Sequence, residues 1–365
     1  MYCRYEIKVK VAVAGYGLGG CLVRCEAGDF IQKYTKQLLK WLLVIAILVI
    51  IVYTFRDSAG PILAQLKATA PTVVIGICVM AMVYHLLEGL ITTVLARQYV
   101  PDFTLRQGVT NALLCSFYRV ATLGSGAGIA ALVYLGDQGV SYGESFGLYM
   151  MQYALHKSGI AVFSLIFYLA SCSFMNRYFA QYQWLLLAGY GITAVITLCL
   201  VLFACSRRFH YVAQRLLEWV NRKCRGKLAG QLQQLEEQCA MLEASTDRLL
   251  KRPRILLAVM AINLVKFCFF YGIPYLSFAG TGEIGFLKTL AITSLSVMLA
   301  AVLPAPAGIG STEFVFTGLA SQIVGMDTAG AVALLYRFGT FVFPFLVGGI
   351  VVVIRRVQKR RKHRQ

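Results

Sequence analysis

A carboxylate, two prolines and two glycines interrupt one of the most apolar parts of the chain. Residues 302–316 read Val-Leu-Pro-Ala-Pro-Ala-Gly-Ile-Gly-Ser-Thr-Glu-Phe-Val-Phe, and the carboxylate is Glu313. Proline removes a backbone donor and glycine loosens a helix, so within hydrocarbon the freed backbone must be covered by protein or by a watery cavity. An acid at such a break indicates a site that handles a polar group inside the bilayer. The break consists of Pro304, Pro306, Gly308 and Gly310.

Other ionisable side chains stand inside apolar stretches, and the basic ones outnumber the acidic ones. Burying each costs at least ~2.5–3.5 kcal/mol at the centre of a lone helix. A cationic interior suits an anionic ligand, and arginine can bind phosphate through two parallel hydrogen bonds. We therefore predict a headgroup-binding site made of Arg119, Lys157, Lys266 and Arg337, with Glu313 as their partner or as a gate.

Structural roles stay open for each of these side chains. His85 and Glu88 are three residues apart, so they could pair on one helix face. Arg337 could extend to the outer headgroups, and Glu313 could accept hydrogen bonds from free amides at the break. The two lysines lie nearer the middle of their spans and could form ion pairs there.

Composition and charge indicate a membrane protein. Of the 365 residues, 58% are hydrophobic and 14% are charged, against about a quarter charged in soluble domains. The net charge of +19 is concentrated in residues 207–254 and in the tail 355–364. Because these clusters adjoin apolar runs, we predict cytoplasmic segments that face anionic phospholipid headgroups, and no nucleic-acid partner.

Motifs for other chemistry are missing from the sequence. It contains eleven cysteines but no Cys-x-x-Cys pair, and it has no P-loop, no Gly-x-Ser-x-Gly elbow and no metal-like His spacing. The glycines between 15 and 20 resemble a dinucleotide-binding loop, yet membrane sequence begins near Leu38 and leaves no room for a βαβ unit. We predict neither a cofactor nor a bound metal.

Apolar runs predict an all-α polytopic membrane protein with about six transmembrane helices. Each run is near the ~20 residues that cross a bilayer core. Two further apolar regions are broken: 109–135, at Gly124, Gly126 and Gly128, and 286–325, at 304–310. The predicted spans are 38–55, 72–96, 147–170, 184–205, 254–279 and 330–354.

Positive charge places both termini and the basic loop on the cytoplasmic side. The clear spans already satisfy this topology, so each broken region must return to the face from which it entered. We predict two re-entrant hairpins that enter from opposite faces; two short full crossings per region would satisfy the same parity. Broken segments in corresponding positions of two halves also indicate an inverted repeat, with the substrate site between the halves.

The same pattern predicts the domain organisation. The loop carries leucines near helical spacing with acids on the other side, which predicts an amphipathic helix or hairpin that acts as a connector or as a partner site. The predicted segments are a cytosolic N-terminus (1–37), a first membrane half (38–206), a basic amphipathic cytosolic linker (207–253), a second membrane half (254–354) and a basic cytosolic tail (355–365).

Three segments carry a resemblance to a known family. Residues 303–313 are similar to the Pro-x-Pro-Gly-Gly-x-Gly-x-x-Glu signature of the lysylphosphatidylglycerol synthase transmembrane region, or flippase-like domain, which is the membrane part of the multiple peptide resistance factor. Residues 335–344 resemble the Arg-x-x-Thr-Tyr-x-x-Pro helix that follows it, with Arg337 at the arginine. Residues 122–128 stand where relatives carry Thr-Pro-x-x-x-Gly-Gly, with Gly124 in place of the proline.

The resemblance implies translocation of an anionic or aminoacylated phospholipid, or of a glycolipid, in a bacterial inner membrane. An alternative is a membrane subunit for phosphatidylglycerol lysyltransferase-type modification that needs a separate soluble aminoacyltransferase or glycosyltransferase. A third is an interaction protein that docks partners through 207–253. Since the sequence ends at Gln365, eleven residues after the last predicted span, we expect no catalytic domain on this chain.

Overall fold

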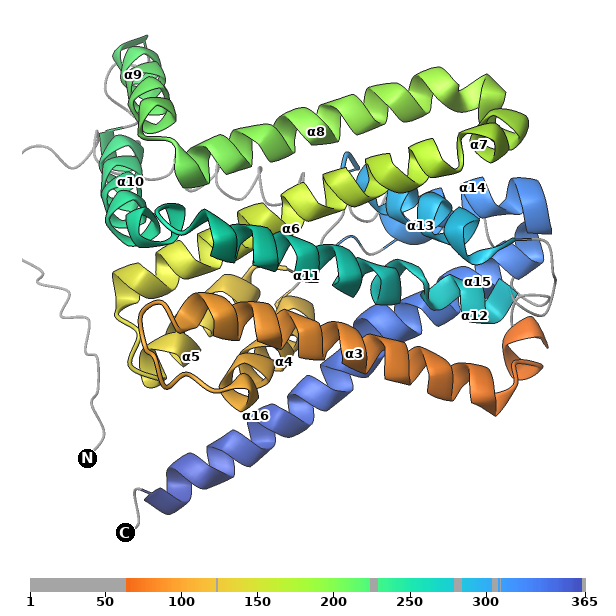
Figure 1. Ribbon diagram of the computed structural model, residues 1–365, viewed down its shortest axis with the longest axis horizontal. Coiled ribbons are helices and arrows are strands. Elements are labelled where there is room, and N and C mark those ends of the chain that lie inside the picture. The colour runs from red at the N-terminus through yellow and green to blue at the C-terminus, as the bar shows by residue number, and fades with distance from the viewer. Residues whose placement is uncertain are drawn as a thin grey trace, which may run out of the picture. The chain divides into compact units, whose positions relative to one another are not determined.

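The computed structural model describes residues 64–122, 124–223, 229–278, 284–303, 308 and 310–362. They belong to one compact unit, and every regular element among them is a helix (Figure 1). The predicted N-terminal segment 1–37, the span 38–55, and Pro304 and Pro306 lie outside the described residues.

Five helical segments are long and apolar enough to cross a membrane, which confirms an all-α polytopic fold. Three are single helices, and the fourth is α11 followed, after Gly272, by the short α12. The fifth contains a π-helical turn, Phe338–Val342, between two α-helices. These helices are α3 (Pro71–Ala96), α6 (Tyr142–Ala170), α8 (Gln183–Cys205), α11 (Pro253–Tyr271), α12 (Ile273–Phe278), α15 (Met326–Arg337) and α16 (Phe343–Lys362).

Both broken apolar regions are helical hairpins. Hairpin 1 is α4 (Leu105–Ala121) and α5 (Gly126–Asp137); hairpin 2 is α13 (Phe286–Ala300) and α14 (Ser311–Val324). Their helices have 12 to 17 residues, so at 1.5 Å per residue they reach about 18–26 Å, short of a ~30 Å core. This length favours re-entrant hairpins over pairs of full crossings. The open ends of the two hairpins lie at opposite ends of the long helices (Figure 1).

Local hydrogen bonds fix where hairpin 1 begins and turns. A capping box starts α4, since the Gln107 backbone N–H donates to Thr104 Oγ1 at 3.3 Å and the Thr104 N–H donates to Gln107 Oε1 at 2.6 Å. At the turn, Thr122 Oγ1 donates to the Tyr118 carbonyl (2.7 Å) and accepts from the Gly126 N–H (2.6 Å). Gly124 has φ +106°, which only glycine adopts without strain.

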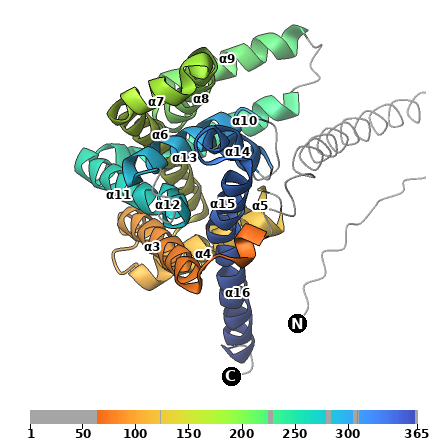
Figure 2. The same ribbon diagram turned by 90° about the vertical axis from the view of Figure 1, so that its right-hand side faces the viewer.

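Each hairpin is held by helices on both sides. Helix α4 packs between α3 and α16, and α13 packs against α6 and α8 while α14 packs against α15. The end-on view of Figure 2 shows α13 and α14 between α8 and α15. Helices α3 and α4 touch through their backbones, because a Cβ on Gly108 would overlap the Gly89 carbonyl oxygen.

A helix, a hairpin and a second helix occur in this order twice. The first set is α3, hairpin 1 and α6; the second is α11–α12, hairpin 2 and α15–α16. In Figure 1, α3 runs in the opposite direction to α11, and α6 runs in the opposite direction to α16. The predicted inverted repeat therefore has units of about 71–170 and 253–362, and α8 stands between them in the sequence.

The linker consists of α9 (Arg207–Lys223) and α10 (Ala229–Leu250). Helix α10 buries Leu242 and Leu249, as the predicted apolar spacing requires, and packs against α6. The residues that follow α10 and α3 are hydrogen-bonded to each other, since Arg252 Nη1 donates to Gln98 Oε1 at 2.5 Å. The segment is helical in the structure, and its role as an amphipathic cytosolic linker stays a prediction.

We expect Gly108→Ala to destabilise the protein by about 1–3 kcal/mol, because the new methyl group forces α4 away from α3. Gly136→Ala is the matched control: it is also a helical glycine, but its Cβ would meet nothing within 4 Å. The thermal unfolding midpoint in detergent measures both. Equal midpoints for the two variants would contradict the close α3–α4 contact.

Candidate functional site

A buried lysine holds three helices together through polar contacts. Lys266 on α11 is 0% exposed. Its Nζ donates to Glu88 Oε2 on α3 (2.5 Å), to Asn263 Oδ1 (2.6 Å) and to His156 Nδ1 on α6 (3.1 Å). An ammonium group has three donors, so all of them are used and its charge is balanced by Glu88.

The glutamate of this pair is also fully engaged. Glu88 Oε1 accepts from Gln152 Nε2 at 2.8 Å, and Gln152 Oε1 accepts from Thr92 Oγ1 at 3.2 Å. The suggested pairing of Glu88 with His85 is therefore wrong, since the carboxylate points to α11 and α6 instead. The imidazole of His85 is 5% exposed, and its Nδ1 has no hydrogen-bond partner among the described residues.

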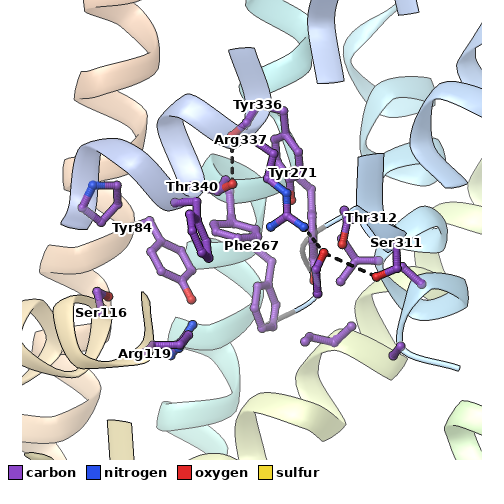
Figure 3. A pocket seen from close by; sticks show the side chains of 18 of the residues that line it. Tyr84, Ser116, Arg119, Phe267, Tyr271, Ser311, Thr312, Tyr336, Arg337 and Thr340 are labelled. Carbon is purple, nitrogen blue, oxygen red and sulfur yellow. Dashed lines mark hydrogen bonds between the residues drawn. The ribbon is translucent and has the colours of Figure 1, made fainter. Parts of the chain in front are cut away.

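A cavity of about 370 Å³ lies beside this network, where the ends of the two hairpins approach each other (Figure 3). The end of α4 contributes Arg119, α6 contributes His156 and Lys157, and the start of α14 contributes hydroxyl groups. The polar side chains of its lining are Tyr84, Ser116, Arg119, His156, Lys157, Tyr271, Ser311, Thr312, Tyr336, Arg337 and Thr340.

Two of the lining cations have no acidic partner in the part of the chain that the structure describes. None of the described carboxylates pairs with Arg119 or Lys157. Lys157 Nζ lies 5.6 Å from the centre of the Tyr153 ring, which is a cation–π contact and leaves the ammonium group free to bind an anion. The cavity therefore carries an excess of positive charge from two different helices.

The third cation closes the break in hairpin 2. Arg337 Nε donates to Glu313 Oε1 at 2.7 Å, and its Nη2 donates to Glu313 Oε2 at 3.0 Å and to the Gly308 carbonyl. Glu313 Oε2 also accepts from the Gly310 N–H at 3.0 Å. Since Gly308 and Gly310 have φ of +69° and +83°, the ion pair stabilises a backbone conformation that favours glycine.

These contacts bear on the alternative roles stated above for Arg337 and Glu313. Arg337 pairs with Glu313 instead of extending to the outer headgroups, and Glu313 binds both the guanidinium and a backbone amide. Arg337 still lines the cavity, as does Gly308. A headgroup in the cavity would therefore meet the side of this ion pair.

Other residues of the predicted site lie outside the cavity lining. Lys266 is buried behind it and contacts three lining residues: His156 by a hydrogen bond, and Tyr84 and Phe267 through their rings. Gly124 and Gly126 form the turn of hairpin 1. A Cβ on Gly128 would lie 3.1 Å from the Tyr149 ring, so this glycine packs closely against that side chain. These glycines shape the turn next to Arg119 and do not contact the cavity.

Sequence reasoning missed the neutral polar partners of the network. Asn263 stands three residues before Lys266, a spacing at which side chains meet on a helix, and this was an available signal. Gln152 belongs to another span, and nothing in its sequence position indicates Glu88. Tyr336 was also missed: it lines the cavity, and its hydroxyl is buried without a hydrogen-bond partner in the described residues.

Fold and site together define a multi-pass helical membrane protein in which two helical hairpins enclose a cationic cavity. The chain belongs to the family described as the lysylphosphatidylglycerol synthase TM region, whose family model matches residues 38–348. The matched range includes the break motif, Arg337 and both hairpins, in agreement with the resemblance of the sequence. A comparison with curated proteins finds no match.

We expect Lys266→Met to destabilise the protein by about 3–5 kcal/mol, because it leaves the charge of Glu88 buried without a partner. The double variant Lys266→Met/Glu88→Gln removes both charges and should recover most of the loss. Lys157→Met is the control, since this lysine has no carboxylate partner among the described residues. Thermal unfolding in detergent measures all three, and a double variant no more stable than Lys266→Met would argue against the ion pair.

Proposed function

We propose that this protein moves the headgroup of an anionic phospholipid between the two leaflets through the cavity between its hairpins. The observation that carries the proposal is the position of Arg119 and Lys157, two cations without carboxylate partners among the described residues, in a cavity lined by residues of both hairpins. Cations inside a membrane protein are costly, and an anionic substrate offsets the cost each time it passes.

The chemistry of the lining fits a phosphodiester. Arg119 offers a planar guanidinium for two parallel hydrogen bonds, and Lys157 offers a point charge on the neighbouring helix. Ser311 and Thr312 supply hydroxyl groups at the start of α14, where helix amides favour negative charge. An aminoacylated phospholipid keeps this phosphodiester, so it belongs to the same substrate class.

In this proposal Glu313 is the gate. Arg337 is held by Glu313 in the structure and also faces the cavity. A phosphate that enters the cavity competes with the carboxylate for the guanidinium, and it thereby loosens the contact that fixes the break in hairpin 2. The same residues would then bind the substrate and open its exit.

An apolar groove next to hairpin 1 offers a place for an acyl chain. It has a volume of about 420 Å³ and runs between α5 and α16, from Thr122 at the turn to Arg355 and Arg356. Its walls include the exposed side chains of Ile129 and Val133. The chain of a lipid could stay in this groove while its headgroup occupies the cavity on the other side of α4.

We also propose a bacterial inner-membrane location with both termini in the cytoplasm. The basic end of α16 and the linker helices lie at the same end of the long helices in Figure 1. This arrangement agrees with the excess of positive charge expected on the cytoplasmic side.

A second candidate function is the membrane part of a lipid-modifying system. The family description refers to lysylphosphatidylglycerol synthesis, and α9 exposes an apolar face of Tyr211, Val212, Leu216 and Trp219. This face could dock a soluble aminoacyltransferase or glycosyltransferase. Lysine transfer to phosphatidylglycerol by a purified mixture of both proteins, with none by either alone, would favour this function.

The test of translocation uses liposomes with a fluorescent phosphatidylglycerol, in which dithionite quenches the outer leaflet. We expect wild-type protein to allow quenching beyond the outer-leaflet half, and Arg119→Gln/Lys157→Gln to stop near that half. The matched control is Arg177→Gln/Lys288→Gln, which removes two exposed cations from α7 (Cys172–Phe179) and α13 that lie outside the cavity. Equal loss in both double variants, or no quenching beyond half by wild type, would contradict the proposal.

The gate is tested by Glu313→Gln in the same liposomes. We expect translocation to fall at least tenfold, because without the carboxylate Arg337 has no anionic partner to return to and the break cannot close again after each passage. Glu218→Gln on α9 is the control for loss of one carboxylate. A rate that equals the wild-type rate, in a variant with a normal unfolding midpoint, would remove Glu313 from the mechanism.

A further inference from the structure

His156 joins the cavity to the buried ion pair. It belongs to the cavity lining, and its Nδ1 accepts a hydrogen bond from Lys266 Nζ at 3.1 Å. The proposed passage of a headgroup uses neither His156 nor the pair of Lys266 with Glu88. Charged groups inside a membrane protein are costly, and the connection of this largely buried network to the cavity calls for a function of its own.

The hydrogen bonds determine the protonation of the imidazole. Because Nδ1 accepts from the Lys266 ammonium, its lone pair is occupied, and a neutral imidazole carries its proton on Nε2. Lys266 uses its other two donors for Glu88 and Asn263. A second proton on His156 must therefore replace the hydrogen bond from Lys266.

Three positive groups lie around His156, and like charges disfavour a second proton on its imidazole. The positive groups that face it come from α11, from α4 and from the next position on α6, and Glu88 on α3 is the one described anion that faces it. The stretches of α13 and α14 that line the cavity carry no charged side chain there. The positive groups are Lys266, Arg119 and Lys157.

An anion in the cavity changes this balance. A phosphodiester bound by Arg119 and Lys157 would neutralise part of the positive charge next to His156, and it would attract a proton to the imidazole. The proton adds to Nδ1, the hydrogen bond from Lys266 breaks, and Lys266 keeps Glu88 and Asn263 as partners. A hydronium ion of the aqueous medium donates the proton and becomes water, so no covalent bond of the protein or the lipid breaks.

We propose that His156 is a proton-binding site, and that each anionic headgroup is bound in the cavity together with one proton. This inference rests on the proposed function and adds an energy source, since a proton gradient would then drive the lipid. Linkage is reciprocal: the proton raises the affinity for the anion by the factor by which the anion raises the affinity for the proton. Affinity should therefore fall by up to about tenfold per pH unit as the pH rises.

The experiment measures binding of a short-chain phosphatidylglycerol to the purified full chain in detergent by titration calorimetry. A phosphodiester keeps its single charge between pH 5.5 and 8, so the lipid itself does not titrate. Comparing buffers of different ionisation enthalpy gives the number of protons taken up per lipid. We expect close to one proton for wild type, and an affinity that falls with pH.

The variants His156→Asn and His156→Gln keep an acceptor for Lys266 but cannot take a second proton. We expect them to bind the lipid with no proton uptake and with an affinity that does not change with pH. His210→Asn is the control, because this histidine of α9 pairs with Glu243 away from the cavity. It should behave as wild type.

Each result decides one statement. Wild-type binding without proton uptake overturns the inference and leaves the proposed function intact. Proton uptake that persists in both His156 variants also overturns it, because the proton is then bound elsewhere. A wild-type protein that binds no anionic lipid at any pH rejects the proposed function, and the inference with it.

Discussion

The structure depends on satisfying backbone groups that a broken helix leaves free inside a membrane. Hairpin 2 breaks at positions where Gly308 and Gly310 have positive φ, so regular helical hydrogen bonds are lost there. Arg337 and Glu313 replace them: the guanidinium binds the Gly308 carbonyl and the carboxylate binds the Gly310 amide. Hairpin 1 solves the same problem with the Thr122 hydroxyl, which bridges its turn. The charged contacts are the stronger of the two, and they lie in hairpin 2, whose break lines the cavity.

The inverted repeat explains why the polar groups converge. The two units have the same order of elements and run in opposite directions, so one hairpin approaches the cavity from each side. The first helices of the two units, α3 and α11, also meet each other, and they do so through Glu88 and Lys266. Replacing this pair by apolar residues would be less costly to bury. Its hydrogen bond to His156 connects it to the cavity and is the basis of the proposed proton site.

Much of this architecture was predictable from the sequence. Five of the six predicted spans fall on described helices, because runs of about 20 apolar residues have few other folds. Both breaks were predictable because glycine and proline interrupt helices in a known way. Arg119, Lys157 and Arg337 were singled out by their charge alone, and they line one cavity.

Contacts between side chains of different membrane-spanning helices were not predictable in the same way. The choice of Lys266 over His85 as the partner of Glu88 depends on how α3 and α11 pack, and helix rotation is not encoded in local spacing. The same holds for Gln152 and Asn263, whose neutral side chains give no signal until the helices are assembled. For Glu313 the sequence predicted a basic partner without choosing among four, and the packing of α14 against α15 selects Arg337.

The π-helical turn at Phe338–Val342 directly follows Arg337. A π turn holds one residue more than an α turn, so it sets the rotational phase of α15 against that of α16. Conversion of this turn to regular α-helix would rotate α15 by about 100° about its axis, the angle of one residue. That rotation would carry Arg337 away from Glu313 while α16 stays packed on α4. The π turn therefore sets the rotation of α15 at which Arg337 reaches Glu313.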